Sequence, residues 1–242
     1  MANPFFEPLP ENGVPEFDQI LSHHYEEAFE RGFEEQNREI HAIIGNREAP
    51  TFGNTIEAME RSGELLERVG NVFWNLTSSD TSDELQALEL ALSPRLAAHN
   101  SQIYSDPALF KRVQAITESD QALDPEASQL LEEIHGSFVR AGAHLSESAR
   151  ERVNEITESL AGLTTRFGQN VLQDVNEFEL VVDAAEDISG LPDSVLNAAR
   201  SEAESRGKPG QYVFTISRSS ITPFLQYADS RSLREKLYRA YT

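Results

Sequence analysis

The sequence contains no cysteine. Disulfide bonds, thiolate metal ligands and a cysteine nucleophile are therefore excluded. A chain of 242 residues does not need them, because it is long enough to bury a sizeable hydrophobic core. The lack of cysteine is compatible with a reducing cytoplasm, which is the location we expect.

Basic residues are scarce as well. The chain has 20 lysines and arginines against 41 aspartates and glutamates, a net charge of −21. A face that attracts phosphate is hard to build from this balance, so we expect neither a nucleic-acid partner nor a membrane partner. No uncharged apolar run reaches about 18 residues, and residues 1–10 lack the basic and apolar regions of a signal peptide.

The motif of a zinc protease, H-E-x-x-H, is also missing from the sequence. That motif works because two histidines four residues apart share one face of a helix, beside a glutamate that acts as base. The nearest pattern is His23 with Glu27, which supplies two ligands and would need a third from elsewhere. We interpret this pair as a surface or helix-packing pair, and the sequence predicts no metal-ligating residue.

Other catalytic patterns are absent too. His135 precedes Gly136-Ser137, but no G-x-S-x-G elbow, phosphate-binding loop or G-x-G-x-x-G is present. Adjacent acids such as Glu132 and Glu133 are common in an acidic helical chain and indicate solvated faces. The sequence therefore predicts no catalytic residue, and it leaves any substrate-binding residues unknown.

Helix signals dominate up to about residue 174. The first sixteen residues are rich in proline, which predicts an extended arm. Apolar residues at helical spacing predict helices over 17–44 and 56–76. Capping signals follow, each a residue type that accepts a hydrogen bond from the first helical turn: Asn54 with Glu57, Thr81 with Glu84, Asp106 before Pro107, and Asp124 before Pro125.

The clearest helix is predicted over 146–172. Its apolar residues recur every three or four positions, which is typical of a helix that faces the core of a bundle. We therefore expect this stripe to be buried. It comprises Val153, Ile156, Leu160, Leu163, Phe167 and Val171.

The pattern changes after residue 174. Short strands are predicted over 178–182 and 211–217, with a helix between them that opens at Gly190-Leu-Pro192 and ends at Gly207. Pro223 is expected to begin a short helix, and Ser232 with Glu235 to cap a final one.

That final helix, over 230–242, has no capping glycine and presents Tyr238 and Tyr241, so we expect a truncated longer protein. The organisation expected is an arm over 1–16, a helical domain over 17–174 and a mixed segment over 175–242. The fold class is mainly α.

Several segments resemble one family in order along the chain. They include a proline-to-helix turn and two histidine-containing segments, which read Pro50-Thr-Phe-Gly-Asn-Thr-Ile56, His23-His-Tyr25 and Ile134-His-Gly-Ser-Phe-Val-Arg-Ala-Gly-Ala143. Asn3-Pro-Phe-Phe, Ser62-Gly-Glu-Leu-Leu66 and Leu233-Arg-Glu-Lys-Leu-Tyr238 add to the match. Together they resemble the N-terminal portion of the thimet oligopeptidase-like zinc metallopeptidases, and the two histidine segments favour the peptidyl-dipeptidase branch.

The resemblance implies a two-lobed helical enzyme that releases C-terminal dipeptides from short oligopeptides. This chain would form much of the non-catalytic half, one wall of the substrate channel. The zinc site belongs to the other half, which becomes the implied partner of this chain. The 242 residues alone are then expected to bind no catalytic zinc and to be inactive.

Two alternatives stay open. One is part of an endopeptidase of the oligopeptidase A type, because the choice between exopeptidase and endopeptidase depends on groups that capture the terminal carboxylate. The other is a stand-alone helical module that binds peptides or partner helices without catalysis.

Overall fold

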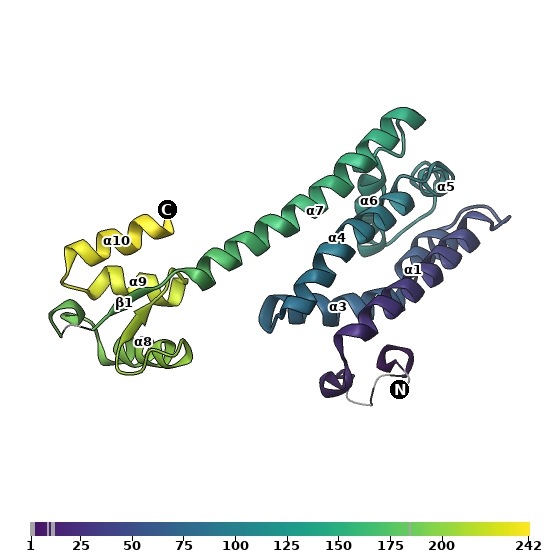
Figure 1. The fold of residues 1–242 in the computed structure, drawn as a ribbon. Helices are drawn as coiled ribbons and strands as arrows, with labels where there is room; N and C mark the ends of the chain where they lie inside the picture. Colours follow the sequence, from purple (N-terminus) through teal and green to yellow (C-terminus); the bar gives the residue numbers. More distant parts are fainter. Residues whose placement is uncertain (1–2, 9, 11–12, 184) are drawn as a thin grey trace. The chain divides into compact units, whose positions relative to one another are not determined.

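The computed structural model describes residues 3–8, 10, 13–183 and 185–242. The expected mainly α fold is confirmed: helices follow one another along the chain, and two short strands form the sheet (Figure 1). The described residues form two compact units, over 1–166 and 167–242. The long helix α7 (Glu147–Glu177) starts in the first unit and continues into the second.

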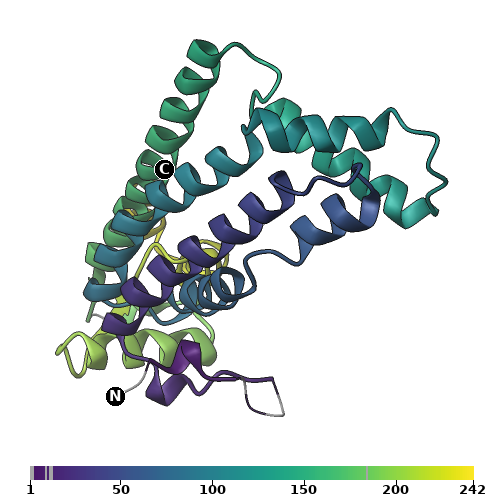
Figure 2. The same cartoon turned by 90° about the vertical axis from the view of Figure 1, so that its right-hand side faces the viewer.

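The first unit is a helical bundle in which α1 packs against α3, and α4 lies beside α1 (Figure 2). Two 3₁₀ turns precede α1, and a π-helical turn precedes α2. The elements are η1 (Pro4–Phe6), η2 (Phe17–Gln19), α1 (Ser22–Ile44), η3 (Phe52–Ile56), α2 (Glu57–Glu60), α3 (Glu64–Ser79), α4 (Asp83–Tyr104), α5 (Pro107–Thr117) and α6 (Pro125–Arg140).

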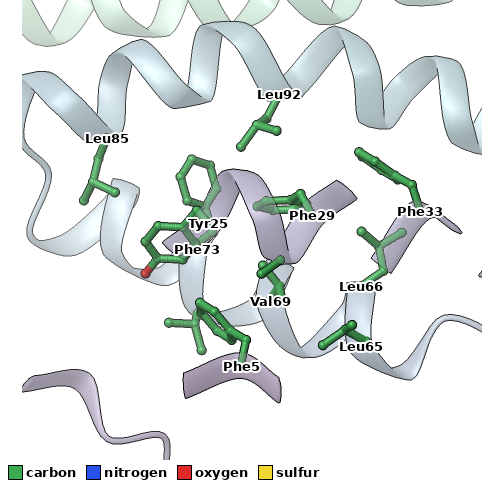
Figure 3. Close-up of a cluster of buried hydrophobic side chains, with 12 residues drawn as sticks. Phe5, Tyr25, Phe29, Phe33, Leu65, Leu66, Val69, Phe73, Leu85 and Leu92 are labelled. Carbon is green, nitrogen blue, oxygen red and sulfur yellow. The ribbon is translucent and has the colours of Figure 1, made fainter. Parts of the chain in front are cut away.

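Two hydrophobic clusters hold this unit together. The first joins η1, α1, α3 and α4, and aromatic rings dominate it (Figure 3). Phe73 meets Tyr25 and Phe29 edge to face, with ring centroids 5.0 and 5.5 Å apart. The second cluster joins the end of α1 to η3, α2, α5 and α6 around Phe138 and Leu109.

The N-terminal arm is only partly extended. η1 packs Phe5 into the first cluster, and the guanidinium of Arg68 donates to the carbonyl oxygen of Phe5 at 2.7 Å. The Asn3 side chain also donates to the backbone carbonyl of His24 at 2.9 Å. The expectation of a simple extended arm is therefore wrong for 4–6, whereas residues 1–2, 9 and 11–12 of that arm lie outside the described residues. The helix predicted over 17–44 begins only at Ser22, after the separate 3₁₀ turn η2 at 17–19.

The two Asp-Pro starts are confirmed. The carboxylate of Asp106 accepts hydrogen bonds from the backbone N–H groups of Ala108 and Leu109, both at 2.8 Å. The carboxylate of Asp124 accepts one from Ala127 at 2.8 Å. In both helices proline occupies the first helical position, where its missing N–H has no helical partner to lose.

The other two caps were predicted at the wrong residue. Asn54 is not the N-cap of a capping box with Glu57. It is the last residue of a capping box whose N-cap is Thr51, and the Thr51 hydroxyl accepts a hydrogen bond from the Asn54 N–H at 3.1 Å. The Asn54 carbonyl oxygen accepts in return from the Thr51 N–H at 2.9 Å. Ser82, not Thr81, is the N-cap of α4. In each case a neighbouring hydroxyl competes for the same role, so the pattern alone does not fix the register.

The second unit is built around an antiparallel pair, β1 (Leu180–Val182) and β2 (Tyr212–Phe214), with Leu180 opposite Phe214. Both predicted strands are therefore present but shorter than expected. Helices cover them and form a third cluster around Phe224 and Leu237. The other elements are η4 (Ala185–Ile188), α8 (Asp193–Ser205), α9 (Arg218–Tyr227) and α10 (Arg231–Tyr241).

Two helix starts in this unit differ from the prediction. Pro223 lies inside α9, which begins five residues earlier at Arg218. The N-cap of α10 is Ser230, two residues before the expected Ser232. Pro223 is the sixth residue of α9, so the helix goes without the backbone hydrogen bond that another residue at this position would donate to the carbonyl of Ser219.

The long helix α7 gives the clearest disagreement with the sequence analysis. The prediction that its apolar stripe is buried is wrong, because no residue of α7 is fully buried. Phe167 is 70% exposed, Leu163 57% and Leu160 56%. Pro94 of α4 lines a shallow cavity together with Glu155, Ser159 and Arg166 of α7, and one member of the stripe, Leu163, also borders this cavity.

Arg112 on α5 ties together two segments that are distant in the sequence. It is 8% exposed, and its guanidinium donates to the backbone carbonyl of Asn46 at 2.9 Å and to the side-chain oxygen of Asn54 at 3.1 Å. The loop after α1 and the turn η3 are thereby held by one side chain. A planar guanidinium suits this task because its N–H groups point in several directions at once.

We expect Arg112→Leu to lower the free energy of unfolding by about 1–3 kcal/mol, because it leaves the half-buried acceptors of Asn46 and Asn54 without this donor. Urea unfolding followed by circular dichroism measures this. The control is Arg61→Leu, which removes an exposed pair with Glu57 and should cost less than about 1 kcal/mol. An equal effect of the two substitutions would contradict the role assigned to Arg112.

Two buried histidines also join elements of the first unit. His24 is 6% exposed, and its Nδ1 accepts a hydrogen bond from the Leu21 N–H at 3.1 Å at the start of α1. His99 on α4 is 5% exposed, and its Nε2 lies 2.7 Å from the side-chain oxygen of Gln36 on α1. Burial lowers the pKa of both rings below 6.5, and the neighbouring His23 contributes further at His24.

These histidines should make the protein less stable in mild acid. Because the folded pKa is lowered, the unfolded chain binds more protons, so their contribution is present above about pH 6.5 and is lost as the pH falls further. We expect the double variant His24→Asn, His99→Gln to lose less stability than the parent between pH 7.5 and pH 5.5.

Urea unfolding at both pH values measures the difference. His144→Gln, at an exposed position, is the control and should leave the pH dependence of the parent unchanged. An identical acid-induced loss in the parent and in the double variant would show that other groups cause it.

Candidate functional site

No group of three or more acidic or histidine residues that could hold a metal ion occurs in the described part of the chain. His23 is exposed, and its ring lies against that of His24, with centroids 4.1 Å apart and planes tilted by 56°. The Glu27 carboxylate accepts a hydrogen bond from the Asn3 side chain at 3.2 Å. The pair is therefore engaged in local packing, as we interpreted it from the sequence.

Ser137 is not placed as a nucleophile. It lies within α6, where its hydroxyl donates to the backbone carbonyl of Glu133 at 2.9 Å and accepts from Arg140 at 3.0 Å. His135 packs its ring on Phe110, with centroids 5.5 Å apart. An activated serine needs a base within hydrogen-bond reach, and here the hydroxyl is bonded to its own helix instead.

Buried tyrosines do not supply acid–base chemistry at neutral pH. Burial raises the pKa of Tyr25 to about 12. The pKa of Tyr104 is also raised, by burial first and by the nearby Glu60 second. Both phenols therefore stay protonated at neutral pH and contribute to packing.

The cavity beneath the N-terminal arm has a volume of about 540 Å³, and arm residues line most of it. Among its described lining residues the one basic group is Arg68, whose guanidinium already donates to the carbonyl of Phe5. Glu7 and Glu16 on the same lining disfavour an anionic ligand. This cavity therefore belongs to the attachment of the arm.

The candidate functional surface is the apolar face of α7, defined by Ile156, Leu160, Leu163, Phe167 and Val171. All five side chains are at least 43% exposed. Burying a side chain of this kind typically stabilises a protein by about 1.5–3 kcal/mol, a gain that is not realised here. Contiguous exposed apolar faces of this sort mark interaction surfaces. The periodicity correctly predicted which residues share the face, but not that the face is open.

No described helix is long and apolar enough to cross a membrane. No protein-family model matches the chain.

Relatives among known proteins are nevertheless clear. The chain is 36% identical over 229 residues, 94% of its length, to the dipeptidyl carboxypeptidase of Escherichia coli, and equally to that of Salmonella typhimurium. It is 30% identical over its whole length to oligopeptidase A of Haemophilus influenzae. The chain spans about a third of the length of these relatives, 34% of the first two and 35% of the third.

The mainly α fold agrees with the fold that the sequence resemblance implied. The identity is spread over nearly the whole chain and is higher to the dipeptidyl carboxypeptidases than to oligopeptidase A. The chain is therefore related along its length to part of the thimet oligopeptidase-like peptidases, and the resemblance that its sequence motifs predicted is confirmed.

Proposed function

We propose that this chain is the N-terminal, non-catalytic part of a cytoplasmic zinc peptidase that releases dipeptides from the C-termini of short oligopeptides. The observation that carries the proposal is the 36% identity to two dipeptidyl carboxypeptidases over 94% of the chain. The identity to oligopeptidase A is 24–30%. The lower value makes an endopeptidase the second choice.

In this proposal the chain contributes shape and no reactive group. The zinc ion would be held by residues outside these 242, where it activates a water molecule for attack on the peptide bond. The task of this part is to form a wall that admits short unfolded peptides and excludes folded proteins. A steric task of this kind needs a rigid surface, which the two aromatic and aliphatic clusters of the first unit provide.

The proposal predicts that the full gene product and the 242-residue chain differ in peptidase activity. The full product should release dipeptides from an oligopeptide with a free C-terminus, and a chelator should abolish the release. The 242-residue chain should show no such activity under the same conditions. Mass spectrometry of the products measures both. Chelator-sensitive cleavage by the 242-residue chain alone would refute the assignment of catalysis to the rest of the protein.

A matched pair of peptides separates the two types of enzyme. The pair has the same sequence and differs only in a free or an amidated C-terminus. An exopeptidase must bind the terminal carboxylate, so amidation should reduce its rate by about tenfold or more. Equal internal cleavage of both peptides would assign the protein to the oligopeptidase A type.

A further inference from the structure

The apolar face of α7 lacks a partner among the described residues, and the composition of the helix changes where that face is most exposed. Six of the twelve residues over 147–158 are charged. Over the fifteen residues of 159–173, only Arg166 is charged. At the 25% of charged residues in the whole chain, about four would be expected there. An exposed surface helix is normally charged, so this segment has the composition of a buried one.

A second copy of this chain is a poor occupant. Each copy carries a net charge of −21, so two copies repel one another across any shared interface. A short oligopeptide is a poor occupant as well. The face spans 16 residues from Ile156 to Val171, about 22 Å at a rise of 1.5 Å per residue, which matches a packed helix better than a short extended peptide.

We infer that the apolar face of α7 is the docking surface for the catalytic part of the same polypeptide, which packs a helix along Ile156, Leu160, Leu163 and Phe167. This inference rests on the proposed function, because it needs the longer protein. The relatives are long enough to contain such a catalytic part, since about two thirds of each lies outside the segment that this chain matches.

Thiol labelling tests the inference, because the 242 residues contain no cysteine. Single cysteines are introduced as Leu160→Cys and, separately, Phe167→Cys. Two positions are used so that the result does not depend on the folding of one variant. Glu151→Cys is the matched control, because Glu151 is exposed on the same helix and lies on the side opposite the apolar face. Each variant is made in the 242-residue chain and in the full gene product with any other cysteines replaced by serine.

Maleimide labelling rates are then compared. We expect both test cysteines to react rapidly in the 242-residue chain and about tenfold or more slowly in the full product, while the control reacts at a similar rate in both. Equal rates at Leu160→Cys and Phe167→Cys in the two proteins would overturn the inference. Slow labelling already in the 242-residue chain would also overturn it, and sedimentation would then show whether a second copy or the chain itself covers the face.

Dipeptide release measured on the same full-length preparation keeps the two proposals separate. An active product with freely labelled cysteines would overturn the docking inference alone. An inactive product with protected cysteines would overturn the proposed function and leave the docking surface in place.

Discussion

The first unit depends on the close approach of α1 and α3. At Gly32 on α1 an added Cβ would lie 3.0 Å from the Cα of Leu66 on α3, so only a residue without a side chain lets the two backbones come this near. That distance allows Phe29 and Phe73 to meet edge to face between the helices. The same packing fixes α4 through Leu92 and places Gln36 beside His99. A tightly packed bundle of this kind resists deformation, which is what a channel wall needs.

Local signals in the sequence predicted the elements well wherever one residue decides the structure. Asp106 and Asp124 each combine a carboxylate acceptor with a following proline, and both begin a helix as expected. Where two hydroxyls compete, as at Thr81 and Ser82, the prediction was wrong by one residue. Long-range contacts left no local signal. Arg112 reaches Asn46 and Asn54, which are 66 and 58 residues away, and no spacing rule connects them.

The error at α7 has a different physical origin. Periodicity tells which side chains share a face of a helix, but the element that covers that face is a tertiary property. The sequence did hold a second signal. Over 159–173 only Arg166 is charged, while the apolar spacing continues on both sides of it. A helix that is apolar on one face and uncharged on most of the others is typical of an interior position. Read together, the two signals predict a partner that the bundle itself does not supply.

The acidic surface and the apolar face act in opposite directions on the isolated chain. Leu160 and Phe167 favour association, because water is released when they are covered. The net charge of −21 opposes association between like chains and does so most strongly at low ionic strength. A partner that carries a compensating charge avoids this repulsion, and a partner in the same polypeptide is held at a high effective concentration in spite of it, whereas a second copy has neither advantage. The charge balance therefore selects among occupants of the α7 face.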